Sequence, residues 1–100
     1  MAENPRGVSV KVRFYASLRD RLGMDEKTLQ LDKNRSFASL VDKLKEAIGE
    51  GINVIVDDEG SLRGNVTISV NNKLIKASDL AKLKLGNGDT VALMPLPSGG

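Results

Sequence analysis

Residues 36–48 read SFASLVDKLKEAI, and this stretch decides the fold because it is the clearest helix in the chain. Its apolar side chains recur at the spacing of one helical face: Phe37, Leu40, Val41, Leu44, Ala47 and Ile48. Ser36 is a natural N-cap, and Gly49 or Gly51 can end the helix. A single long helix must bury such a stripe, and the valine-rich strands around it are the expected partner.

Two strands are predicted before this helix. The first carries alternating apolar residues that share one face: Val8, Val10, Val12 and Phe14. Residues 16–23 predict a short helical turn that Gly23 can stop. Residues 27–31 predict an antiparallel return strand with Leu29 and Leu31 inward.

The segments after the helix predict further strands. Residues 66–70 alternate clearly, the Asn71-Asn72 pair suits a tight hairpin, and residues 73–75 return as a short strand. One helical turn is expected at residues 78–80 and a turn at residues 86–89. The last strand, residues 90–94, has Val91 and Leu93 inward and Ala92 and Met94 outward. Residues 52–64 are the least certain segment: residues 52–56 are compatible with a short strand, and the acidic residues 57–59 fit a solvated turn better than a calcium loop.

This order of elements predicts an α+β domain of the β-grasp (ubiquitin-like) type. We expect a mixed sheet of four to five strands packed on one main helix, with the first and last strands parallel at its centre. A ferredoxin-like fold is the alternative, but it needs a second helix, and residues 77–85 are too short for one. We expect the domain to span residues 1–94 and residues 95–100 to form an extended, flexible tail.

The composition excludes most autonomous catalysis. The 100 residues include no Cys, His or Trp, so the chain has no thiolate nucleophile, no imidazole base and no zinc–thiolate site, and we expect no metal and no bound cofactor. The net charge of +2 is weakly basic, and three aromatic residues are too few to favour nucleic-acid binding. No segment is apolar for long enough to span a membrane and no signal peptide is evident, so we expect a cytoplasmic protein.

The tail is the exception to this lack of chemistry. Pro95 and Pro97 favour an extended chain, and Gly99 and Gly100 follow without side chains. Such a segment can enter a narrow channel and present a terminal carboxylate there. We therefore predict that Gly100, together with Gly99, is the reactive end of the chain.

The chain resembles the MoaD family, the small subunit of molybdopterin synthase. The matching stretches are residues 10–19 (VKVRFYASLR), 70–71 (VN), 85–91 (LGNGDTV) and 95–100 (PLPSGG). The resemblance implies that a ubiquitin-activating-type partner, using ATP, adenylates Gly100. It implies further that a sulfur donor converts the adenylate to a thiocarboxylate, and that the large subunit of the synthase receives the sulfur for the pterin precursor. The chain would thus be a non-autonomous subunit of a sulfurtransferase.

Three functions remain open from the sequence. The first is a sulfur carrier for molybdenum or tungsten cofactor synthesis. The second is a related carrier or modifier acting in tRNA thiolation, thiazole synthesis or isopeptide conjugation. The third is a β-grasp binding module whose two glycines are incidental. For partner binding we expect an outward strip on the last strand, the tail and the neighbouring first strand: Ala92, Met94, Leu96, Pro97, Ser98, Arg13 and Tyr15.

Overall fold

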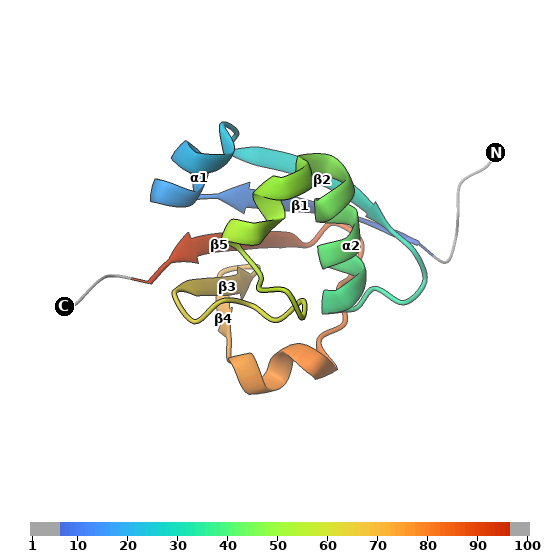
Figure 1. Ribbon diagram of the computed structural model, residues 1–100. Coiled ribbons are helices and arrows are strands. Elements are labelled where there is room, and N and C mark those ends of the chain that lie inside the picture. Colours follow the sequence, from blue (N-terminus) through green and yellow to red (C-terminus); the bar gives the residue numbers. More distant parts are fainter. Residues whose placement is uncertain (1–6, 97–100) are drawn as a thin grey trace.

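The computed structural model describes residues 7–96, which form one mixed five-stranded sheet with helices on one side (Figure 1). The strands lie in the order β2-β1-β5-β3-β4. Strands β1 and β5 are parallel, and every other pair is antiparallel. The strands are β1 (Val8–Phe14), β2 (Glu26–Leu31), β3 (Val66–Val70), β4 (Lys73–Ile75) and β5 (Thr90–Pro95). The predicted β-grasp topology is confirmed, with the first and last strands side by side inside the sheet.

Helix α2 (Phe37–Ile48) crosses one face of this sheet and closes the core. It begins as predicted, because the Ser36 hydroxyl accepts a hydrogen bond of 3.2 Å from the backbone N–H of Ser39. Leu40 and Leu44 are almost completely buried. Other members of the apolar stripe, Phe37, Val41, Ala47 and Ile48, pack against the core but are only partly buried. Complete burial of the stripe was therefore too strong an expectation, because a cylinder resting on a sheet fully covers only its central line of side chains.

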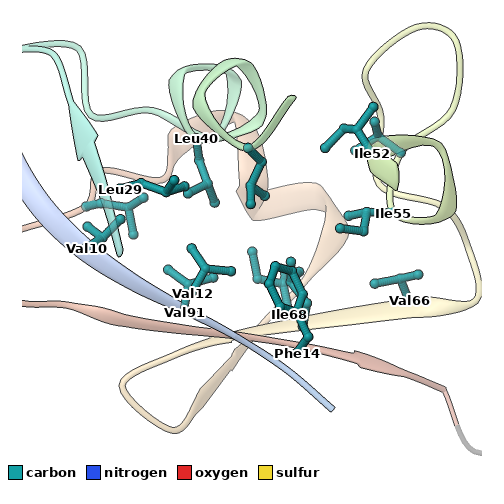
Figure 2. Close-up of a cluster of buried hydrophobic side chains, with 14 of the residues drawn as sticks. Val10, Val12, Phe14, Leu29, Leu40, Ile52, Ile55, Val66, Ile68 and Val91 are labelled. Atoms are coloured by element: carbon teal, nitrogen blue, oxygen red, sulfur yellow. The ribbon is translucent and has the colours of Figure 1, made fainter. Parts of the chain in front are cut away.

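The hydrophobic core lies between α2 and the inward face of the sheet (Figure 2). Each long strand contributes alternate residues, so β1 buries all four of its predicted apolar side chains. Val12, Ile68 and Val91 are 0% exposed. The opposite side of the sheet, called the outer face below, carries the other set of alternating residues.

Residues 49–56 differ from the sequence expectation. The structure has a 3₁₀ helix, η1 (Gly49–Val54), where a short strand was considered, and the only β-pairing of this segment within the described residues is one bridge, Val56 to Leu62. Ile52, Ile55 and Val56 are nevertheless buried, at one end of the core. A short apolar run does not distinguish a strand from a buried helical turn, and here the N–H groups of residues 55 and 56 bond to the carbonyl of Ile52.

The remaining connections follow the predicted turn chemistry. Helix α1 (Ala16–Leu22) ends at Gly23, which has φ +72°. Asn71 and Asn72 both have positive φ, of 52° and 72°, as the β3–β4 hairpin needs. A second 3₁₀ helix, η2 (Ala77–Lys82), follows β4.

Asp89 organises the turn that leads into β5. Its Oδ2 accepts a hydrogen bond of 2.7 Å from the N–H of Gly86, and its Oδ1 accepts one of 2.9 Å from the side-chain amide of Asn71. The Asn71 Oδ1 in turn accepts a bond of 3.0 Å from the N–H of Thr90. Two stretches that carry the sequence resemblance, around residues 71 and 86–89, are therefore joined by a structural network.

The last strand runs further than the sequence pattern indicates. Pro95 is still opposite Val66 in the ladder, and the Leu96 N–H donates to the carbonyl of Asn65 at 2.9 Å. The strand therefore ends one residue later than the expected end at residue 94, because the ladder with β3 continues through Pro95. Chain that is free of the sheet can begin only after Leu96.

Candidate functional site: the outer face and the root of the tail

The predicted reactive end lies outside the described residues. This applies to Gly99 and Gly100 and also to Pro97 and Ser98, which were predicted to contact partners. The structure does describe where the tail leaves the domain. Leu96 is 45% exposed and is held to the neighbouring strand through its backbone. The tail thus extends from β5, a strand with a neighbour on each side, at the same end of the sheet as α1 (Figure 1).

Ala92 and Met94 lie on the outer face, as their alternation with Val91 and Leu93 predicts. Both are partly buried rather than exposed, because β5 has a strand on each side. In the ladder Ala92 is opposite Ser69 and Met94 is opposite Thr67, whose hydroxyl donates to the Met94 carbonyl at 3.1 Å. These outward side chains therefore have a fixed position in the middle of the sheet.

Arg13 and Tyr15 continue this surface onto the first strand. Arg13 is the parallel partner of Ala92, and the Tyr15 N–H donates to the Leu93 carbonyl at 3.1 Å. The Arg13 guanidinium carbon lies 5.7 Å from the centre of the Tyr15 ring, a distance compatible with a cation–π contact. The structure thus brings together four predicted contact residues, Arg13, Tyr15, Ala92 and Met94, and places Leu96 one residue beyond β5.

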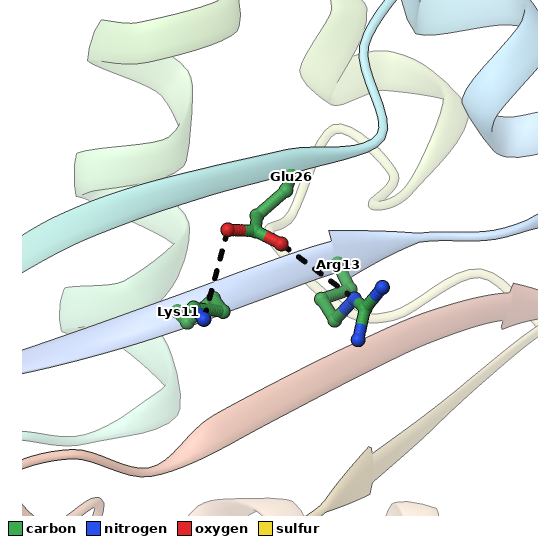
Figure 3. Close-up of polar contacts among 3 residues, drawn as sticks. All are labelled: Lys11, Arg13 and Glu26. Atoms are coloured by element: carbon green, nitrogen blue, oxygen red, sulfur yellow. Dashed lines mark ion pairs between the residues drawn. The ribbon is translucent and has the colours of Figure 1, made fainter.

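The basic residues of this surface are not isolated charges. Lys11 Nζ lies 3.7 Å from one carboxylate oxygen of Glu26, and Arg13 Nε lies 3.8 Å from the other (Figure 3). All three side chains are two-fifths to one-half exposed, so these contacts add little to stability. One carboxylate facing two cations leaves a local charge of +1.

Sequence reasoning missed Leu74, which is the most exposed large hydrophobic residue described, at 65%. It lies on edge strand β4 opposite Ser69, so it shares the outer face with Ala92. The signal was available, because a two-residue Asn-Asn hairpin fixes the register and gives Leu74 the same parity as Ser69. We call the surface formed by Tyr15, Leu74, Ala92, Met94 and Leu96 the outer patch.

Two other kinds of feature are not found among the described residues. Across residues 7–96 there is no group of three or more carboxylate, His or Cys side chains that could hold a metal ion. Over the same residues no helix is both long enough and apolar enough to cross a membrane. The outer patch and the tail root are the features that the sequence prediction and the structure share.

Comparison with known proteins assigns this arrangement to a family. The model of the ThiS family matches residues 12–100, which includes the tail and nearly the whole sheet. The chain belongs to the ThiS family. This ThiS-family chain is a ubiquitin-like sulfur carrier of the ThiS/MoaD type, which confirms the family resemblance found in the sequence.

Several solved structures show the same fold. Small archaeal modifier protein 1 from Methanosarcina acetivorans is 26% identical, with 94% of this chain and 98% of that one covered and a TM-score of 0.74. A protein described as a candidate subunit 1 of molybdopterin converting factor, from Pyrococcus furiosus, is 25% identical, with 90% and 99% covered and a TM-score of 0.69. A complex of subunits 1 and 2 of molybdopterin-converting factor from Helicobacter pylori contains a chain that is 24% identical, with 93% and 100% covered and a TM-score of 0.62. No curated protein matches the sequence significantly.

Proposed function

We propose that this chain is the sulfur carrier of molybdenum or tungsten cofactor synthesis and that Gly100 is its reactive residue. The observation that carries the proposal is the family match, which runs through Gly100. The similarity to the Pyrococcus furiosus protein favours the molybdopterin destination. We place the reaction in the cytoplasm, where a partner supplies the ATP.

In the proposed reaction this chain contributes only the carboxylate of Gly100, and its partners contribute the ATP and the sulfur chemistry. A carboxylate oxygen of Gly100 attacks the α-phosphorus of ATP in the activating enzyme, and pyrophosphate leaves. A persulfide sulfur of the donor then attacks the acyl carbon, and AMP leaves. A second thiol of the donor breaks the S–S bond, which releases the Gly100 thiocarboxylate and leaves a disulfide on the donor. The absence of Cys and His from this chain agrees with that division of labour.

The structure limits where the partner's active centre can be. Leu96 is bonded to Asn65, and Gly100 lies four residues further along the chain. Four residues span at most about 14 Å when fully extended. The reaction centre of the activating enzyme and that of the synthase large subunit must therefore each come within about 14 Å of Leu96.

The outer patch is the surface that we propose docks these partners. It is apolar, it lies beside the tail root, and a partner seated on it would reach the tail directly. The Helicobacter pylori structure contains two different subunits, which is the kind of assembly that this proposal requires.

Two tail variants test the proposal. Deletion of Gly99 and Gly100 shortens the chain by about 7 Å, and addition of one Ala after Gly100 moves the carboxylate by one residue. A misplacement of about 1 Å can lower a rate about 100-fold, so both variants should lose ATP–pyrophosphate exchange with the activating enzyme. Their melting temperatures should equal that of the parent. Exchange by the extended variant at the parental rate would refute the terminal-carboxylate mechanism.

The alternatives predict different products. A sulfur carrier gains about 16 Da when one carboxylate oxygen becomes sulfur, and only a carrier for this pathway transfers that sulfur to the pterin precursor with the large subunit. The likeness to the archaeal modifier favours a second candidate, a modifier that would form isopeptides with lysine side chains. A carrier for tRNA thiolation or thiazole synthesis would form the thiocarboxylate but not the pterin product. A plain binding module would form none of these.

A further inference from the structure

A polar hollow opens on the outer face next to the outer patch. Its volume is about 310 Å³, and three strands and the β3–β4 hairpin contribute to its walls. Seven residues line it: Arg13, Tyr15, Ser69, Asn71, Asn72, Thr90 and Ala92. None of them carries a carboxylate, and most present hydrogen-bond donors.

Ser69 forms part of the hollow and is unusual among the serines. It is only 6% exposed, yet its hydroxyl makes no hydrogen bond to any described residue. Ser39, which is similarly buried at 9%, donates its hydroxyl to Asp32 at 3.1 Å. No buried side-chain oxygen or nitrogen of the described residues lacks a hydrogen-bond partner, so the Ser69 hydroxyl remains accessible from the hollow and can hydrogen-bond to a group that enters it.

Arg13 supplies a positioned charge at the same hollow. Its Nε faces Glu26, and its guanidinium lies near the Tyr15 ring. Figure 3 shows its two terminal nitrogens on the side away from Glu26. They are therefore available as a pair of donors with the geometry that suits a carboxylate.

The other polar side chains of the hollow divide into used and free groups. The Asn71 side chain is fully engaged, because its amide donates to Asp89 and its oxygen accepts from Thr90. The side chains of Asn72 and Thr90 make no hydrogen bond to described residues and can donate. The hollow thus combines one cation with several neutral donors, whereas the nearby carboxylates of Glu26 and Asp89 contact lining residues but do not line it, and this lining favours an anion.

We propose that this hollow receives the carboxylate of an Asp or Glu side chain from the protein that docks on the outer patch. Tyr15 and Ala92 belong to both the hollow and the patch, so one partner covers both at once. The Arg13 side chain is 49% exposed, and water screens its charge until a docked surface excludes that water. A free small anion would therefore bind weakly, whereas a partner's carboxylate would bind in a drier site. The inference rests on the proposed function only in assuming that a partner docks on this face.

The test measures binding of the full chain to the activating enzyme and to the synthase large subunit, separately and without ATP. Arg13→Gln should raise the dissociation constant for at least one of them about 30-fold, which is the loss expected when one member of a desolvated charge pair is removed. Arg13→Lys should restore only part of the affinity, because an ammonium lacks the paired donors. Ser69→Ala should weaken the same complex several-fold. Lys45→Gln, which removes one charge from exposed α2 on the other side of the sheet, is the matched control and should change the affinity less than twofold.

Three further measurements separate the possible outcomes. The maximal rate of pyrophosphate exchange at saturating Arg13→Gln carrier should equal that of the wild type, since the charge acts on docking alone. Charge reversal, Arg13→Glu, should be rescued by an acidic-to-lysine substitution in the partner. In a titration with sodium acetate, the NMR signals of residues 13 and 69 should not saturate below about 100 mM.

Two results would overturn the inference alone: wild-type affinity of Arg13→Gln for both partners, or tight binding of free acetate. Failure of the wild-type chain to bind either partner would overturn this inference and the proposed function together.

Discussion

The same Leu→Ala substitution, made once on each side of the sheet, separates the contribution of a side chain to folding from its contribution to partner docking. Leu44 on α2 is 1% exposed, whereas Leu74 on β4 is 65% exposed. Replacing either by Ala removes the same three carbons, each worth about 0.8 kcal/mol when fully buried, or about 2.4 kcal/mol in total. The two variants therefore differ only in where that burial takes place.

For Leu44→Ala the whole loss of burial lowers the stability of the domain, because this side chain is buried inside it. The cavity left between α2 and the sheet adds to the transfer free energy, so the free energy of unfolding should fall by about 3–4 kcal/mol. The melting temperature of a domain of this size should then fall by about 15–25 °C. Calorimetry and urea unfolding measure both values.

For Leu74→Ala only about a third of the side chain is already covered, so the stability loss should be about 0.8 kcal/mol. The remaining 1.6 kcal/mol, approximately, is available to a partner, so the dissociation constant for the docked protein should rise about 15-fold. Isothermal titration of the variant against the activating enzyme and the large subunit measures this change. A stability loss near 3 kcal/mol for Leu74→Ala, or unchanged affinity for both partners, would refute the assignment of Leu74 to the outer patch.

Two further substitutions test features that position the site. Asp89→Ala leaves the Gly86 N–H and the Asn71 amide without their acceptor, so the free energy of unfolding in urea should fall by about 1–3 kcal/mol, and by less for Asp89→Asn. Equal stability of wild type and Asp89→Ala would show that the turn does not depend on this carboxylate. Gly51→Ala places a methyl group 2.7 Å from Leu22 Cδ2, and this overpacking should lower the free energy of unfolding by about 1 kcal/mol. The double variant with Leu22→Ala should lose less stability than the sum of the two single variants, and strict additivity would contradict the contact between η1 and α1.

Local signals predicted most of the fold correctly. The Ser36 N-cap, the Gly23 stop and the Asn71-Asn72 hairpin are decided by interactions within a few residues, so the sequence contains all of their information. Alternation on β1 and β5 predicted which side chains enter the core, because successive side chains of a strand point to opposite faces. The short strand considered at residues 52–56 is wrong, because residues 49–54 form a 3₁₀ helix.

The candidate site also has a part that was predicted from the sequence and a part that was missed. Arg13, Tyr15, Ala92 and Met94 were expected on one surface, because parity and the parallel pairing of the first and last strands follow from the element order. The reactive end was predicted from the composition of residues 95–100 and from the family resemblance. Leu74 and Ser69 were missed, since each is one residue in a short segment whose importance depends on its neighbours across the sheet.

The sequence by itself determined the elements, the core face of each strand and the family to which the chain belongs, because alternation, helical spacing, caps and the matched stretches are all local patterns. Only the tertiary structure decided what the outer face presents. It placed Leu74 of the edge strand on the same face as Ala92, put the Ser69 hydroxyl in the wall of the hollow, pointed the two terminal nitrogens of Arg13 away from Glu26 and held Leu96 to Asn65. These relations join residues that lie far apart in the sequence, and their distances depend on sheet register and packing, which no single stretch of sequence specifies.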